Sequence, residues 1–96
     1  MELFVFARFR ARLGAENAVA QALLKVLEPS RAEAGCLSIH AFQSRRDARL
    51  FYIHSRWVDE AAFEDQAGLP HTVDFIAAVE GLVDQPVEVT RADLIG

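Results

Sequence analysis

The segment ELFVFARFR, Glu2 to Arg10, constrains the fold most, because it is apolar on both faces when it is extended. Side chains alternate between the two sides of a strand. One side therefore carries Leu3, Val5, Ala7 and Phe9, and the other side carries Phe4 and Phe6. A chain of 96 residues builds one modest core. One face of this strand can use that core, so the other face needs a different partner.

Composition and charge exclude several classes of protein. The net charge is −4 at pH 7, whereas a nucleic-acid-binding protein normally carries a clustered basic surface. No apolar run approaches the length of a membrane span. The first residues lack the pattern of a charged stretch followed by an apolar one, so a signal segment is not expected. Cys36 is the single cysteine, so no disulfide can form within the chain. We expect one soluble, cytoplasmic domain over residues 1–96.

The first half of the chain predicts a strand followed by a helix. The strand is expected to run to about Arg12. Apolar residues then repeat at three and four positions from Ala18 to Leu27, which predicts a helix with one buried face. Pro29 lacks the N–H that a helix interior needs, so we expect a kink or a fresh turn there. Gly35 is expected to end the helix in a left-handed conformation.

The second half begins with two strands, CLSIHAFQ (36–43) and RLFYIHSRWV (49–58), joined by the polar turn SRRDA. Asp59 is a good N-cap for a short helix that Gly68 ends. Pro70 stands near the start of a further helix with one buried side. The chain then turns into a last alternating strand, VEVTRADLI.

This order of elements is typical of the ferredoxin-like βαββαβ class of α+β folds, in which an antiparallel sheet carries its helices on one face. The first and third strands are central in that topology. Phe4 and Phe6 then look out of the opposite face, beside Tyr52 or Phe51 of the third strand.

Three partners could cover this aromatic face. RNA-binding domains of the same topology stack bases on it, but their glycine-rich, basic motif is absent from RLFYIHSRW. A membrane surface would need a basic amphipathic helix, which the sequence lacks. A second copy of the sheet remains. We therefore expect a homodimer with four interface residues, Phe4, Phe6, Tyr52 and His54.

Three stretches resemble the antibiotic biosynthesis monooxygenase (ABM) family: EPSRAEAGCLS at 28–38, Trp57, and LPHTVDF at 69–75. The resemblance covers nearly the whole chain in matching order. It implies a dimeric α+β barrel, in which two four-stranded sheets pack face to face. It also implies, for some members, oxygenation of aromatic polyketides or quinols that needs no metal or organic cofactor. The haem-degrading branch resembles this chain less. At the three positions where that branch has its functional residues, this chain has Ala7, Gln66 and Ile76.

His71 is the leading candidate for a catalytic group. It follows Pro70 in the first turn of a helix, where the positive end of the dipole disfavours an imidazolium. A neutral imidazole can accept a proton from a phenol or quinol, or donate a hydrogen bond to a substrate oxygen. The alternative is a histidine that only helps to cap the helix.

The expected substrate pocket lies between the sheet and the helices of one subunit. Its lining residues would be Val5, Ala7, Trp57 and Phe75, together with His71. Arg56 is placed to meet an anionic substrate.

Other polar residues are expected to be structural. Glu28 and Arg31 have the spacing of an ion pair on a helix, and Glu33 is grouped with them. Arg49 belongs to a solvated turn. His40 is expected to share a strand face with Cys36. The three histidines lack the spacing of a metal-binding motif, so no metal is expected.

These features together predict a cofactor-independent monooxygenase that acts on a small aromatic phenol, quinol or polyketide-like substrate. Two alternatives stay open. One is a non-catalytic dimeric module that binds a small ligand or supports a stress pathway. The other is an isomerase or decarboxylase on the same barrel, which needs a base but no oxygen.

Overall fold

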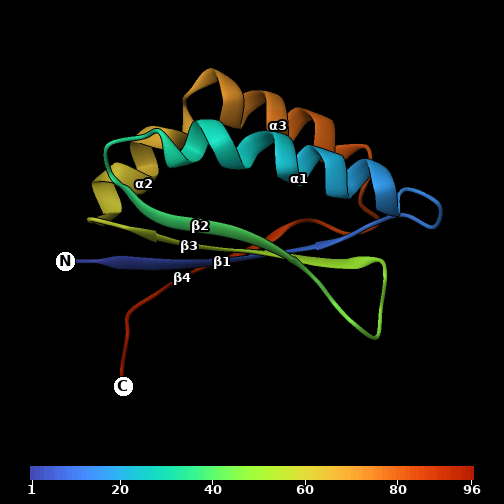
Figure 1. Ribbon diagram of the computed structural model, residues 1–96, viewed down its shortest axis with the longest axis horizontal. Coiled ribbons are helices and arrows are strands. Elements are labelled where there is room, and N and C mark those ends of the chain that lie inside the picture. The colour runs from blue at the N-terminus through green and yellow to red at the C-terminus, as the bar shows by residue number, and fades with distance from the viewer.

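A computed structural model describes all residues, 1–96, as one antiparallel sheet covered on one face by three helices (Figure 1). The elements in chain order are β1 (Leu3–Arg10), α1 (Glu16–Arg31), β2 (Cys36–Gln43), β3 (Leu50–Trp57), α2 (Glu60–Ala67), α3 (Pro70–Glu80) and β4 (Glu88–Ala92). This is the predicted ferredoxin-like α+β fold. None of the helices is long and apolar enough to cross a membrane.

The strands are arranged in the order β2-β3-β1-β4, so β1 and β3 are central as predicted. In their antiparallel register Ala7 lies opposite Ile53, and Phe6 lies opposite His54. Ala7 and Ile53 point toward the helices and are buried, whereas Phe6 is 49% exposed on the other side. The first strand therefore has the predicted residues on its inner face and on its outer face.

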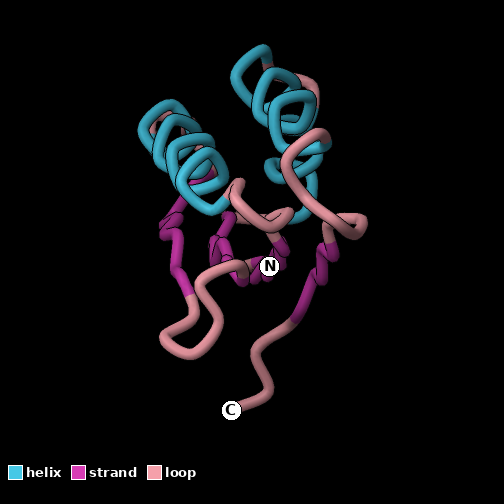
Figure 2. The backbone as a smooth tube through the Cα atoms, turned by 90° about the vertical axis from the view of Figure 1, so that its right-hand side faces the viewer, coloured by secondary structure: helices cyan, strands magenta, loops and turns pink.

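The core lies between the sheet and two helices, α1 and α3, which lie side by side over it (Figure 2). Val19 and Leu23 of α1 and Val79 of α3 are almost fully buried against the strands. Phe51 is also buried, at 2% exposure, so of the two expected neighbours of Phe6 only Tyr52 lies on the outer face.

Local signals explain the ends of the two later helices. The Asp59 side chain accepts a hydrogen bond from the Ala62 N–H at 2.9 Å, which caps α2. Gly68 ends that helix, and Pro70 occupies the first turn of α3. All three predictions are confirmed.

Pro29 does not begin a fresh turn, which was one of the two expected outcomes, because α1 continues past it. The helix continues to Arg31, and the Ala32 N–H still donates to the Glu28 carbonyl at 3.2 Å. Pro29 stands in the last turn, so it removes one donor and leaves little helix beyond it to be disrupted.

Gly35 is not left-handed, which corrects a second expectation. The only residue with a positive φ is Gly14, at 89°. Gly35 is needed for a close approach instead, because a Cβ atom built on it would lie 2.4 Å from the Cβ of Ala62 in α2. The Val58 N–H also donates to the Gly35 carbonyl at 2.9 Å. The loop after α1 thus packs directly against the start of α2.

Gly35→Ala should lower the free energy of unfolding by about 1–3 kcal/mol, the usual effect of forcing extra volume into a packed contact. Gly81→Ala is the matched control, because no atom lies within 4 Å of its Cβ position and its φ is −79°. Urea unfolding followed by circular dichroism should show the control to be as stable as the parent or more so. Equal stability of both variants would show that the structure around Gly35 and Ala62 accommodates the added methyl group without loss of stability.

A bulge in β2 corrects the expected placement of His40. The register with β3 shifts between Cys36 and Ser38, so Cys36 lies opposite Trp57 while Ser38 lies opposite Arg56. Cys36 therefore packs with the core, and His40 lies on the other face of the sheet.

Both terminal strands are shorter than expected. β1 ends at Arg10, and only one bridge follows it, between Ala11 and Val83. β4 ends at Ala92 rather than at Ile95. The residues beyond it leave the sheet on the side away from the helices (Figure 1), and Leu94 and Ile95 are exposed.

Candidate functional site

A cavity of about 660 Å³ lies between the sheet and the helices α2 and α3. This volume is within the range of roughly 300–1,000 Å³ that is typical of small-molecule sites. Fifteen of its 23 lining residues are hydrophobic. The sheet contributes Val5, Ala7, Phe9, Ile53 and Trp57, and the helices contribute Phe63, Phe75, Ile76 and Val79.

Four of the predicted lining residues, Val5, Ala7, Trp57 and Phe75, do surround this cavity. Trp57 is 1% exposed and packs edge-on against the ring of Phe63, with 5.7 Å between the ring centroids. Phe75 packs edge-on against Phe9, also at 5.7 Å. Aromatic side chains thus wall the cavity at both ends of the β1 strand.

Arg56 lies away from the cavity, which differs from the expected contact with substrate. Its register partner is Phe4, whose ring lies 5.6 Å from the guanidinium carbon, and its Nε donates to the Glu2 carboxylate at 2.6 Å. The strand period explains the placement, because neighbouring residues of β3 point to opposite faces and Trp57 points to the helices.

His71 does not line the cavity either. Its Nε2 lies 2.9 Å from Oε2 of Glu33, in the loop that follows α1. The two side chains are 24% and 15% exposed. Its neighbour Thr72 is the residue of this helical turn that lines the cavity. No sequence pattern predicts this pair, since 38 residues separate its members and only the packing of α3 beside the loop brings them together.

In the neutral imidazole, one nitrogen donates and the other accepts. The Glu33 carboxylate only accepts, so it selects the tautomer with hydrogen on Nε2 and leaves the Nδ1 lone pair free to take a proton. Glu33 therefore has a positioning contact with the leading catalytic candidate, in addition to the structural use expected for it.

Arg31 has a structural role, but its partner is not Glu28. Its Nε and Nη2 both donate to the carbonyl oxygen of Ile39, at 3.2 and 2.9 Å. The guanidinium fork thus ties the end of α1 to β2.

Two hydrogen bonds between side chains of the cavity wall were not predicted, and of their four members only Trp57 was predicted as a site residue. The Trp57 indole N–H donates to Ser55 Oγ at 3.0 Å, and the Thr72 hydroxyl donates to Gln66 Oε1 at 2.8 Å. Ser55 and Thr72 are buried. Ser55 could have been inferred from its parity with Trp57, whereas the Thr72–Gln66 pair depends on how α3 folds back against α2.

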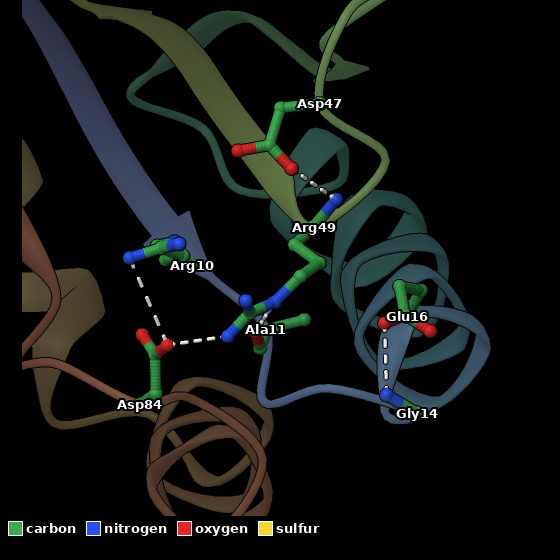
Figure 3. Close-up of polar contacts among 7 residues, drawn as sticks. All are labelled: Arg10, Ala11, Gly14, Glu16, Asp47, Arg49 and Asp84. Atoms are coloured by element: carbon green, nitrogen blue, oxygen red, sulfur yellow. Dashed lines mark hydrogen bonds and ion pairs between the residues drawn. The ribbon is translucent and has the colours of Figure 1, made fainter.

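Only two ionisable residues, Glu80 and Asp84, line the cavity, and both are exposed. Asp84 is bound by Arg49, whose Nη2 lies 2.5 Å from its carboxylate, and Arg10 lies 3.9 Å away (Figure 3). Arg49 also donates to the Ala11 carbonyl at 2.9 Å. It is therefore a structural link rather than part of a solvated turn, and the cavity interior is uncharged.

Cys36 and the histidines do not form a reactive cluster. Burial, followed by the nearby negative charge of Glu33, raises the pKa of the Cys36 thiol, so it stays protonated at neutral pH. No group of three or more His, Cys, Asp or Glu residues is placed to hold a metal ion.

The outer face of the sheet brings together the four residues expected at a dimer interface, Phe4, Phe6, Tyr52 and His54. The His54 ring lies 4.8 Å from that of Phe6 and 6.4 Å from that of Phe4, between ring centroids. Tyr52 is 38% exposed. On the edge strand β2, Phe42 lies opposite Tyr52 and extends this aromatic surface.

Comparisons with known proteins find relatives that are similar to this chain in sequence and in fold. The curated "Putative monooxygenase Rv0793" of Mycobacterium tuberculosis is 34% identical over 86 residues, which cover 90% of this chain and 84% of that protein. The solved structure of Rv0793 has a TM-score of 0.94 at 29% identity, over 100% of this chain and 97% of that chain. The crystal structure of PA3566 from Pseudomonas aeruginosa has a TM-score of 0.92 at 33% identity, over 99% and 95%.

The family profile described as antibiotic biosynthesis monooxygenase matches residues 3–78, which extend from the first strand through most of α3. This segment includes both central strands and the helices over the cavity. The chain therefore belongs to the antibiotic biosynthesis monooxygenase family.

Proposed function

We propose that the protein is a monooxygenase that oxidises a small aromatic phenol or quinol inside the cavity, without a metal or organic cofactor. The observation that carries this proposal is the cavity itself, which is apolar, aromatic-walled and large enough for a small aromatic molecule. Membership of the family and the monooxygenase name of the relative from M. tuberculosis support the same reaction class.

The chemistry needs a base and exclusion of water. A phenol or quinol with hydrogen on a ring carbon ortho or para to a hydroxyl loses that hydroxyl proton, and the electron-rich anion passes one electron to O₂. The resulting radical and superoxide combine to form a carbon–oxygen bond. Loss of water from the hydroperoxide then yields a quinone. One oxygen atom of O₂ enters the product and the other leaves as water, so O₂ supplies the whole oxidising capacity.

His71 is the proposed general base. The contact with Glu33 leaves Nδ1 as its free acceptor, and His71 adjoins Thr72 at the α2 end of the cavity. Substrate would meet the imidazole at this end, where the first turn of α3 borders the cavity. The Glu33 carboxylate would also stabilise the imidazolium that forms when His71 takes the proton.

His71→Ala should lower kcat/KM for oxygen uptake by about 100-fold or more, because a positioned general base contributes roughly 10²–10⁴ in rate. An oxygen electrode with a panel of hydroquinones and naphthols measures this effect. Asp74→Asn, an exposed change on the same helix, is the control and should keep the parental rate. Absence of uptake by the parent with every substrate would refute the oxygenase, and parental uptake by His71→Ala would remove the role of this residue.

A non-catalytic ligand-binding module is the second candidate. The uncharged interior of the cavity favours it, because His71 does not line the wall and both ionisable lining residues are exposed. Such a module would bind the same aromatic molecules with no oxygen uptake. Calorimetric binding measured beside the oxygen electrode separates the two functions.

We also infer that a second copy of the chain covers the outer face, to give a dimeric α+β barrel. Exposed aromatic side chains cluster there, among them Phe6, Phe42 and Tyr52. Contiguous apolar surface of this kind usually marks an interface. An isologous dimer would place the same patch of both copies in contact.

A further inference from the structure

The α2 end of the cavity differs from the rest of its wall because it holds most of the interior polar groups. Gln66 of α2 and Thr72 of α3 lie there, joined by a 2.8 Å hydrogen bond. Phe63, one helical turn before Gln66, packs against Trp57, whose indole donates to Ser55. The hydrogen bonds of this end decide which kind of atom a ligand can place against it.

The Thr72 contact fixes which atoms Gln66 has left to offer. Its Oε1 accepts the Thr72 hydroxyl proton, so its Nε2 carries the two remaining donors. No side chain or carbonyl of the protein accepts from Nε2 in the structure. The cavity wall contains one other glutamine, Gln85, which lies in the loop after α3. Gln66 is half-buried, so water reaches Nε2, and an acceptor oxygen of a ligand in the cavity can replace that water.

Ser55, like Gln66, has a hydrogen-bond donor left for a ligand. The Trp57 indole N–H can only donate, and it donates to Ser55 Oγ at 3.0 Å. The Ser55 hydroxyl proton is therefore free to donate into the cavity. No ionised group lines this end, so a carboxylate that would compete for these donors is absent from its wall.

We propose that Gln66 determines specificity by binding an acceptor oxygen of an otherwise apolar ligand at the α2 end of the cavity. The oxygen is of the carbonyl or phenolate type, with no proton to donate. This inference rests on the proposed function only in requiring that the cavity hold a small aromatic molecule. The same amide would stabilise a phenolate oxygen after proton loss, because hydrogen bonds to charged groups are the stronger ones.

The test compares two probes with one carbon skeleton, 1-tetralone, which carries a carbonyl acceptor, and tetralin, which carries none. Trp57 is the only tryptophan of the chain and lies in the cavity wall, so its fluorescence reports binding. The parent protein should bind tetralone about 3- to 10-fold more tightly than tetralin, after correction for their different transfer from water, as one net hydrogen bond allows.

Gln66→Met keeps the length of the side chain and removes the donors, and it should bring the corrected ratio of the two dissociation constants close to 1. Gln66→Glu keeps the acceptor for Thr72 and offers only acceptors, so it should favour tetralin. Gln85→Met is the matched control at the other glutamine of the wall and should keep the parental ratio. Gln66 is half-buried on a helix without buried residues, so these variants should fold.

An unchanged ratio in Gln66→Met, or loss of the preference in Gln85→Met instead, would overturn the proposal. So would equal corrected affinity of the parent for the two probes. The measurement needs neither oxygen nor turnover, so its result is separate from that of the oxygen-uptake experiment. A protein that failed to consume oxygen would still show the preference if Gln66 acts as proposed.

Discussion

Trp57→Ala should lower the free energy of unfolding by about 3–5 kcal/mol, the usual effect of truncating a buried aromatic residue. Trp57 is 1% exposed, and it packs with Leu3 and Val5 in a small cluster at one end of the sheet. Each kcal/mol shifts the melting temperature of a domain this size by roughly 4–8 °C. Thermal unfolding followed by far-ultraviolet circular dichroism should therefore show a fall of more than about 10 °C.

Two variants separate the cause of this loss. Trp57→Phe keeps an aromatic ring against Phe63 and removes the hydrogen bond to Ser55, so it should cost about 1–2 kcal/mol, less than the alanine variant. Leu24→Ala removes an apolar side chain that is 58% exposed on α1, and it should change stability by less than about 0.5 kcal/mol. A Trp57→Ala protein as stable as Leu24→Ala would show that Trp57 is not part of the core.

Phe6→Asp should convert the proposed dimer to monomers. In an isologous interface each substitution appears twice, so two carboxylates would be buried among the rings of Phe4, His54 and their counterparts. An unpaired buried charge is strongly unfavourable, whereas in a monomer the same side chain is open to water. Size-exclusion chromatography with light scattering should report the mass of one chain, 10.7 kDa.

Leu24→Asp is the control for added charge, because Leu24 is equally apolar and exposed but lies on α1, on the helical side of the sheet. It should leave the mass at twice that of one chain. A dimeric Phe6→Asp protein would place the interface elsewhere, and a monomeric parent would refute the dimer itself.

Much of the fold could be predicted because the signals are local. Alternation in β1 gave the correct inner and outer faces, and Asp59 and Pro70 gave the correct helix starts. Errors occurred where a local rule met tertiary packing. The sequence predicts a left-handed turn at Gly35, but in the structure the missing side chain of this residue makes room for Ala62. A one-residue bulge in β2, which no alternation pattern reports, moved Cys36 to the core face.

The candidate site was predicted in part, for a related reason. Trp57, Phe75, Val5 and Ala7 line the cavity because strand parity and helix period place them there. The same parity places Arg56 on the outer face, opposite Phe4 and away from the predicted contact with substrate.

By itself the sequence determined the order of the elements, the two faces of the central strand and the family, because each of these depends on residues near one another or on a contiguous pattern. Only the tertiary structure decided that Glu33 binds His71, that Thr72 orients Gln66, and that Arg49 engages Asp84. These contacts join side chains from separate elements, and a hydrogen bond forms only when the distance between donor and acceptor lies within a few tenths of an ångström of its optimum. Periodicity fixes the face on which a residue lies, but the packing of helices on the sheet fixes which polar atoms meet.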